Sequence, residues 1–202
     1  MKETPIFEEL FMRVIRQPGF GLRILVGGLL SFVPVINLFA LGYLYRFARQ
    51  VRRGGSVDLP DWDDWGGLFV DGLRFLVPWL TYWLLPLGLA ALLSGFLRAI
   101  GLGALSYLLF GLVSLVAPFL FCSALYRLQT RSDFKDLLDL VLIFRMTWSE
   151  WPQFLIPALV FVSLFALLLP LYGFPVFFGF LVLVGHTGLC FRRLERKRVV
   201  RI

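Results

Sequence analysis

The sequence predicts an all-α protein, a polytopic bundle of transmembrane helices, and three observations support this prediction. First, 59% of the 202 residues are hydrophobic and only 16% are charged, whereas soluble domains have about 45–50% apolar and about 25% charged residues. Second, several apolar runs are long enough to cross a bilayer, which takes about 20 helical residues. Third, the basic residues gather at the ends of these runs. We therefore expect lipid to cover much of the surface.

Four apolar runs are predicted to span the membrane. Residues 72–96 and 104–126 are joined by a short turn that contains two glycines, so we expect an antiparallel hairpin. Residues 154–191 contain no Lys, Arg, Asp or Glu and are too long for one span of about 20 residues. A cluster of Pro and Gly interrupts this run. It predicts a second hairpin, made of spans 153–171 and 174–191.

The first long apolar run, residues 24–45, has two interpretations. Its length suits one spanning helix, which would be a fifth span. However, Pro34 interrupts the helical hydrogen bonds and Asn37 needs a polar partner inside a membrane, which suits a re-entrant hairpin. The hairpin also keeps the basic N-terminal residues on the side that holds most other basic residues. We therefore expect the hairpin.

Two shorter segments have the periodicity of amphipathic helices. We predict that residues 5–16 and 133–151 each lie in the membrane interface. A polar loop, residues 46–67, follows the first apolar run, and Asp61 or Asp63 is expected to cap the next helix. The apolar face of the first segment consists of Ile6, Phe7, Leu10, Phe11, Val14 and Ile15, and Phe134, Leu137, Leu138 and Val141 repeat part of that spacing.

Basic residues are distributed very unevenly between the two ends of the predicted spans. Fifteen Lys and Arg residues lie at the outer ends of the hairpins, and Arg98 alone lies at the opposite end. The positive-inside rule places the fifteen, and the C-terminus, in the cytoplasm. The basic tail, residues 192–202, adjoins an apolar span, so we expect it to bind anionic lipid head groups and not nucleic acid. Its basic residues are Arg192, Arg193, Arg196, Lys197, Arg198 and Arg201.

Few residues suggest chemistry. His186 is the only histidine and lies within a predicted span, which makes it a candidate functional residue, although a neutral His bonded to a carbonyl is the plainer interpretation. Cys122 and Cys190 lie in apolar runs and match no metal or redox spacing. An acidic cluster could bind a cation or act as acid and base, but we expect it to cap a helix and neutralise nearby arginines. Its members are Asp58, Asp61, Asp63, Asp64 and Asp71. The sequence contains no metalloprotease, phosphate-loop or nucleophile-elbow motif, so we expect no enzyme, no catalytic residue, no metal and no cofactor.

Residues 24–76 carry a series of short motifs. In chain order these are Gly27-Gly28-Leu29-Leu30, Pro34-Val35-Ile36-Asn37, Gly42-Tyr43-Leu44 with Arg46 and Arg49, Leu59-Pro60-Asp61-Trp62-Asp63-Asp64-Trp65, Leu68-Phe69 and Gly72-Leu73. Together they resemble an uncharacterised bacterial and archaeal membrane protein family, domain of unknown function 4013. The resemblance implies a multi-span protein of a prokaryotic plasma membrane and supplies no activity. It also singles out a candidate functional surface of Pro34, Asn37, Gly42, Tyr43, Pro60, Asp61, Trp62, Asp64 and Trp65.

Two functions remain open at the level of sequence. The first is a non-enzymatic membrane protein that organises or regulates the bilayer or a membrane protein partner, which includes further copies of itself, through contacts with anionic lipids. The alternative is a small transporter or channel for a lipid or a small solute, because broken apolar helices are common at transport sites. Its path would be lined by Asn37, Asp71, Arg74 and His186.

Overall fold

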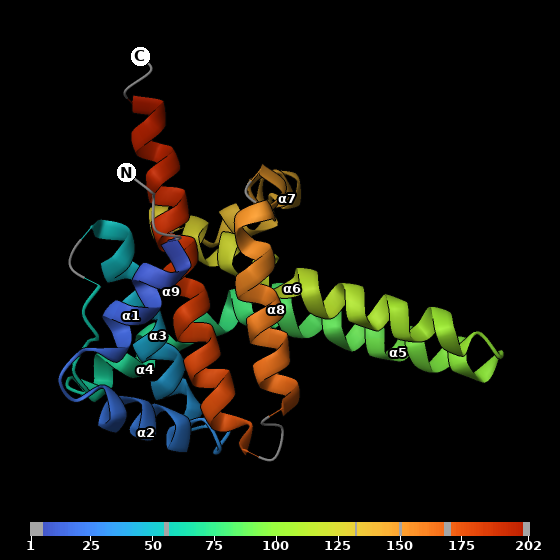
Figure 1. Ribbon diagram of the computed structural model, residues 1–202, viewed down its shortest axis with the longest axis horizontal. Coiled ribbons are helices and arrows are strands. Elements are labelled where there is room, and N and C mark those ends of the chain that lie inside the picture. Colours follow the sequence, from blue (N-terminus) through green and yellow to red (C-terminus); the bar gives the residue numbers. More distant parts are fainter. Residues whose placement is uncertain (1–5, 55–56, 132, 150, 168–170, 200–202) are drawn as a thin grey trace. The chain divides into compact units, whose positions relative to one another are not determined.

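The computed structural model describes residues 6–54, 57–131, 133–149, 151–167 and 171–199, except for the side chains of residues 6, 131, 165, 166 and 194–199. Every regular element in these ranges is helical (Figure 1), which confirms the all-α class. The chain divides into two compact units. One comprises Met1–Leu76 with Pro152–Ile202, and the other comprises Val77–Trp151.

The elements follow one another along the chain with short connections. The first unit contains α1 (Ile6–Ile15), α2 (Phe20–Leu30), α3 (Asn37–Arg53), most of α4 (Trp65–Trp79), α8 (Trp151–Leu167) and α9 (Gly173–Val199). The second unit contains the end of α4, the π-helical turn η1 (Leu80–Leu84), α5 (Leu85–Ala99), α6 (Gly103–Arg131), the 3-10 helix η2 (Phe134–Leu138) and α7 (Leu140–Ser149).

Three helical stretches are long and apolar enough to cross a membrane. They are Trp65–Ala99, Gly103–Thr130 and Gly173–Arg193. We expected the first stretch to begin at residue 72, but it begins earlier, at Trp65. The reason is that Asp64, directly before Trp65, caps the start of the helix. The predicted span 153–171 appears as α8, whose 17 residues end at Leu167, and residues 168–170 lie outside the described ranges. The described helices therefore supply three candidate spans, fewer than the four or five that we predicted.

The apolar run 24–45 is not one continuous helix. Helix α2 ends at Leu30, and the hydroxyl of Ser31 donates to the Gly27 carbonyl at 2.8 Å in its last turn. Turns that contain Pro34 follow, and α3 begins at Asn37. The break lies where the hairpin interpretation placed it, because a proline supplies no N–H for the helical ladder. Residues 24–45 therefore do not form one continuous helix.

The polar loop is shorter than predicted. Helix α3 continues to Arg53, because its later turns bury Phe47 and Val51. It ends at Gly54, which adopts φ 85°, a left-handed conformation that favours glycine and commonly terminates helices. The basic tail is also partly helical, because α9 extends to Val199.

Helix α9 is the central helix of the first unit. Helices α1, α2 and α3 all pack against it, and 78% of the apolar window within Gly173–Arg193 is buried by the protein. Glycines along α9 allow these close contacts. A side chain at Gly185 would meet Leu10 and Phe47, and one at Gly188 would meet Val51. The predicted helix 5–16 is confirmed as α1, with Leu10 and Val14 fully buried.

The segment 133–151 does not form the single amphipathic helix that we predicted. It forms η2 and then α7, with Asp139 between them in a non-helical conformation. The side chain of Asp133 accepts from the Lys135 N–H at 2.9 Å, and that of Asp139 accepts from the Leu142 N–H at 3.0 Å. Aspartates that cap in this way favour a new start over continuation of one helix.

Candidate functional site

The candidate surface is organised around a close crossing of α3 and α4. A Cβ atom on Gly42 would collide with the carbonyl oxygen of Leu68, and one on Gly72 would collide with the carbonyl oxygen of Leu38. The two glycines therefore let the helix backbones touch. This contact brings the next turn of α3, which carries Arg46, beside Asp71 on α4.

Arg46 joins the polar loop to α4. Its Nε donates to Asp71 Oδ2 at 3.1 Å, and its Nη2 donates to Asp64 Oδ2 at 2.7 Å. It also donates to the main-chain carbonyls of Asp63 and Asp64 at 3.4 and 3.3 Å. Only 16% of the Arg46 side chain is exposed. A guanidinium with this many charge-assisted partners fixes the loop relative to the helix.

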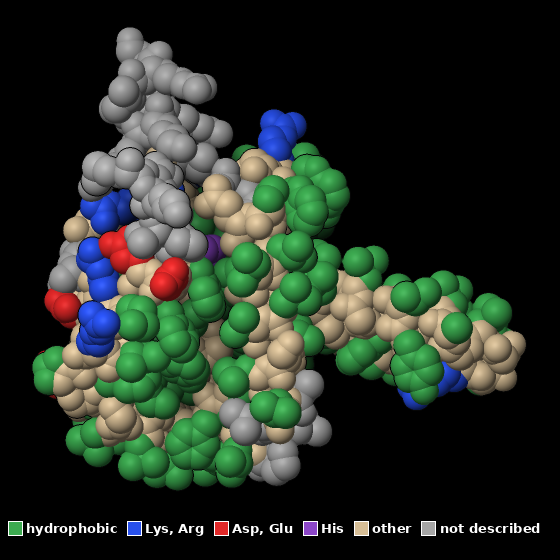
Figure 2. All heavy atoms as spheres, in the orientation of Figure 1, with side chains coloured by type: hydrophobic (Ala, Val, Ile, Leu, Met, Phe, Trp, Pro, Cys, Tyr) green, Lys and Arg blue, Asp and Glu red, His purple; other side chains and the backbone are tan. Residues whose placement is uncertain are grey.

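Asp71 is a buried carboxylate that faces three guanidinium groups. Its side chain is 7% exposed and lies 3.1 Å from Arg46, 3.8 Å from Arg49 and 3.3 Å from Arg74. A buried charge requires such partners, because removing an ion from water otherwise costs roughly several kcal/mol. Figure 2 shows basic and acidic side chains adjacent to each other on this unit, next to a surface of hydrophobic side chains.

Asp64 caps α4. Its Oδ1 accepts from the Gly67 N–H at 3.1 Å, and its φ of 47° is positive. The Gly67 N–H and the Arg46 guanidinium hold the pKa of the Asp64 carboxyl below its ordinary value. We expected Asp61 or Asp63 to provide this cap, and both expectations were wrong. Asp61 instead forms an ion pair with Arg23 at 2.5 Å.

Two polar side chains outside the candidate surface hold the same loop. Gln17 Nε2 donates to the Val57 carbonyl at 2.5 Å, and Gln17 Oε1 accepts from the Leu59 N–H at 2.7 Å. Arg23, from α2, adds its ion pair with Asp61. Neither residue was expected from the sequence, because nothing local marks a side chain whose partners lie some 40 positions away.

An aromatic stack connects the loop to α3. The rings of Tyr43 and Trp62 are stacked, with centroids 4.3 Å apart and an interplanar angle of 20°. Trp62 also stacks on Trp65, and both Tyr43 and Trp62 contact Phe177 on α9. The Tyr43 hydroxyl and Trp62 Nε1 are buried, and neither has a hydrogen-bond partner in the described part of the chain. The structure thus brings together the two motifs that the sequence singled out separately.

Pro34, Asn37 and Pro60 lie outside this stack. Pro34 is exposed in the break between α2 and α3. Asn37 is the first residue of α3, and its Oδ1 is buried without a hydrogen-bond partner among the described residues. Pro60 is half-buried in the loop, next to buried Leu59.

His186 occupies a different environment on α9. It is 3% exposed, and its Nε2 lies 3.0 Å from the Gln153 carbonyl oxygen and 3.4 Å from Cys190 Sγ. Phe7 and Phe154 present ring edges to it. Its Nδ1 has no hydrogen-bond partner among the residues described. None of the residues that contact His186 is among the ion-pair partners of Asp71. His186 and Asp71 therefore belong to separate clusters.

The predicted head-group site is only partly described. The Arg192 guanidinium lies against Gly54, at the end of α3, and Arg193 is exposed. The side chains of Arg196, Lys197, Arg198 and Arg201 lie outside the described residues.

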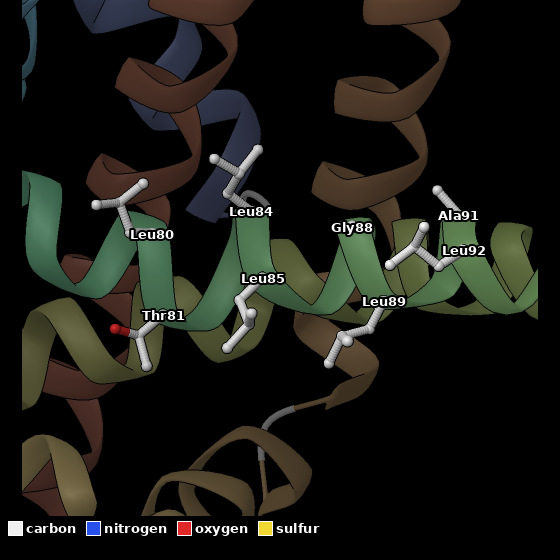
Figure 3. A pocket seen from close by; sticks show the side chains of 8 residues that line it. All are labelled: Leu80, Thr81, Leu84, Leu85, Gly88, Leu89, Ala91 and Leu92. Carbon is white, nitrogen blue, oxygen red and sulfur yellow. The ribbon is translucent and has the colours of Figure 1, made fainter.

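An apolar groove follows η1 and α5 in the second unit. Its volume is about 790 Å³. In Figure 3, Leu80 and Leu84 point to one side of the helix and Leu85 and Leu89 point to the other. The single hydroxyl among the lining residues, that of Thr81, donates to the Val77 carbonyl at 2.9 Å. Such a lining suits hydrocarbon and supplies no evident chemistry.

No three His, Cys, Asp or Glu residues within the described ranges lie together in a way that could hold a metal ion. The architecture is that of an all-helical protein with helices long enough to cross a membrane. The chain belongs to the family described as "Protein of unknown function (DUF4013)", whose model matches residues 26–184. This match confirms the resemblance inferred from residues 24–76. No curated protein and no solved structure matches the chain.

Proposed function

We propose that this protein is a non-enzymatic, multi-pass protein of a prokaryotic plasma membrane that binds anionic lipids through a basic cytoplasmic face. In this role it organises the bilayer or regulates a membrane protein partner, including further copies of itself. The proposed topology has four spans, 72–96, 104–126, 153–171 and 174–191, with α2 and α3 as a re-entrant hairpin. Both termini then lie in the cytoplasm.

The distribution of charge along α5 and α6 is the observation that carries this proposal. Between Phe75 and Tyr126 the only charged residue is Arg98, which lies at the end of α5 where the chain turns into α6. Large apolar side chains are exposed along both helices, for example Leu92 at 74% and Leu108 at 70%. An exposed apolar surface of this extent requires lipid or a partner to cover it.

Positive charge supports the choice of anionic lipids. Arg49 and Arg74 are partly exposed and share one buried carboxylate, while Arg53 and Arg193 are exposed at the ends of α3 and of the candidate span in α9. Cations near a membrane surface attract anionic lipids by about 1 kcal/mol each.

Thermal unfolding of the purified protein in detergent tests the lipid preference. A ligand that binds the folded state raises the melting temperature, so phosphatidylglycerol should raise it more than phosphatidylcholine with the same acyl chains. Salt should reduce the difference, because it screens exposed charges. An equal effect of the two lipids at low salt would contradict the proposal.

Cysteine labelling tests the topology. A cysteine placed near residue 3 should resist a membrane-impermeant maleimide in intact cells and react after the membrane is opened. A cysteine in the turn at Gly101 should react in intact cells. Strong labelling near residue 3 from outside would contradict the hairpin arrangement of α2 and α3.

One observation favours the transporter alternative. Asn37 Oδ1 and His186 Nδ1 are buried polar atoms without hydrogen-bond partners among the described residues, and such atoms often mark a functional or hydrated site. Solute flux into proteoliposomes that disappears with Asn37→Ala or His186→Ala would support transport. The separate environments of Asn37, Asp71 and His186 make this the second candidate.

A further inference from the structure

Asp71 is surrounded by more positive charge than it can neutralise. Three guanidiniums lie within 4 Å of its single carboxylate, at 3.1, 3.3 and 3.8 Å. Arg46 has two further acid partners, Asp64 at 2.7 Å and Asp63 at 3.8 Å. Arg49 and Arg74 have no acid partner besides Asp71 within the described part of the chain. Arg49 and Arg74 thus have one carboxylate between them, which leaves net positive charge on this pair.

Arg49 and Arg74 also retain hydrogen-bond donors. A guanidinium has five N–H donors, and each of the two directs one terminal nitrogen toward Asp71. Their side chains are 34% and 49% exposed, whereas Asp71 is 7% exposed. The carboxylate thus lies beneath the two guanidiniums, and the remaining donors are accessible to a second anion.

The neighbouring residues of α3 make the site more positive and more rigid. The Arg49 guanidinium lies 5.9 Å from the ring centroid of Tyr45, a cation–π contact. One turn further along α3, the Nε of Arg52 is buried without a hydrogen-bond partner among the described residues. Guanidiniums held in this way lose little freedom when they bind an anion.

Exposed apolar side chains adjoin the cluster on α4. Val70 and Leu73 are 47% and 42% exposed, and they lie four residues and one residue before Arg74. A free phosphate ion would gain nothing from these side chains, but the acyl chain of a phospholipid would pack on them. The combination of cations and apolar surface therefore favours a lipid.

We propose that Arg49 and Arg74, held in place by Asp71, bind the phosphate group of an anionic phospholipid. The inference rests on the proposed function and assigns it a specific site outside the basic tail. Planar guanidiniums suit the purpose, because they match the geometry of phosphate oxygens.

Native mass spectrometry of the full-length protein in detergent tests this site, with phosphatidylglycerol and phosphatidylcholine as probes. The Arg49→Gln, Arg74→Gln double variant should lose about tenfold in affinity for one phosphatidylglycerol, the effect of losing a charge-assisted contact. The matched control is Arg16→Gln, Arg145→Gln. It removes the same charge from two exposed arginines that form no ion pair among the described residues, so its affinity should change less than about twofold.

The outcomes separate this site from the proposed function. A wild-type protein that does not prefer phosphatidylglycerol to phosphatidylcholine would contradict both. A preference that survives Arg49→Gln, Arg74→Gln but disappears when Arg196, Lys197, Arg198 and Arg201 become Gln would overturn the site and leave the function intact. Calorimetry with inorganic phosphate alone shows whether the site prefers a phospholipid head group to free phosphate. Binding as tight as that of the lipid would overturn the assignment to a phospholipid.

A charge-conserving variant covers the case in which the Gln variant does not fold. The Arg49→Lys, Arg74→Lys protein keeps both charges around Asp71 but loses the planar fork of donors. With an unchanged melting temperature, its affinity for phosphatidylglycerol should lie between those of the wild type and the Gln variant. Wild-type affinity in a folded Lys variant would overturn the proposal.

Discussion

Gly42 and Gly72 lie against each other where α3 crosses α4, and a Cβ on either residue would collide with the main chain of the opposite helix. This contact sets the distance between the helices that carry Arg46 and Asp71. It explains why two short motifs of the sequence, one from each helix, contribute to one cluster of charges. The helix crossing is therefore the structural basis of the candidate surface.

Substitution at this crossing should be costly. We expect Gly42→Ala to reduce the free energy of unfolding by about 1–3 kcal/mol, the usual effect of overpacking. Chemical unfolding in mixed micelles, followed by tryptophan fluorescence, measures the change. Gly66→Ala is the control. It lies in the first turn of α4 with nothing near its added Cβ, so it should raise stability by up to about 1 kcal/mol. If the two variants changed stability equally, α3 and α4 would have to lie farther apart than the structure shows.

The side chain of Gln17 should determine how well the polar loop is held. Gln17→Ala removes the hydrogen bonds to Val57 and Leu59 and leaves buried main-chain groups unpaired, at a cost of about 1–3 kcal/mol. Hydrogen exchange of the Leu59 amide should accelerate accordingly. Gln50→Ala, on α3, provides the control and should leave that exchange rate unchanged. Unaltered exchange in Gln17→Ala would mean that other contacts hold the loop.

Stability should fall in acid partly through Asp64. Its pKa is lowered in the folded protein by the Gly67 N–H and by Arg46, so folding favours the ionised form. This contribution is present above the ordinary pKa of 3.8 and is lost as the pH falls through the lower, folded value.

Melting temperatures between about pH 7 and about pH 3 test this expectation. Asp64→Asn should flatten the acid limb of the profile, and Asn tolerates both the cap position and a positive φ. The exposed Asp58→Asn control should follow the wild-type profile. A profile for Asp64→Asn that is parallel to that of the wild type would refute the proposed contribution of Asp64.

In the second unit, Tyr82 should anchor η2. Its buried hydroxyl donates to the carbonyl of Leu137. Tyr82→Phe should therefore reduce the free energy of unfolding by about 1–3 kcal/mol, because the carbonyl loses its partner. Tyr107→Phe, at a side chain that is 72% exposed, should have little effect in the same unfolding experiment. If Tyr82→Phe left the free energy of unfolding unchanged, water would have to replace the hydroxyl as the donor to the Leu137 carbonyl.

Features encoded within a few neighbouring residues could be predicted from the sequence. Pro34 determines the break between α2 and α3, because proline has no N–H for the helical hydrogen bond, whatever its neighbours are. The periodicity of residues 5–16 predicted α1, since one apolar face was sufficient to define it. The glycine at the end of α5, Gly101, adopts φ 83° and forms the expected turn.

Features that depend on competition between neighbours could not be predicted. Asp61, Asp63 and Asp64 are all suitable caps by residue type, and the choice of Asp64 depends on Arg46, which binds it from another helix. In the segment 133–151, Asp133 and Asp139 cap separate elements, although the apolar spacing alone favoured one helix. In both cases side-chain to main-chain bonds outweighed the periodic pattern.

The candidate site was predicted in part. Tyr43, Trp62, Asp64 and Trp65 do meet, but their meeting depends on the helix crossing, which the sequence does not reveal. Only the transport alternative placed Asp71 and Arg74 along a path. The structure places both in an ion cluster with Arg46, as the expected neutralisation of nearby arginines by the acidic residues implies. His186 lies apart with Gln153 and Cys190.

The glycines of α9 have a consequence for biogenesis. Each glycine weakens an isolated helix by about 1 kcal/mol relative to alanine, and those at 173, 179, 185 and 188 all accommodate side chains from other segments of the chain. The ribosome completes α9 after every helix on which it packs. Its stable conformation therefore requires earlier segments to be in place, and a chain truncated before Gly173 would present Phe47 and Phe161 without their cover to the quality-control proteases of the cell.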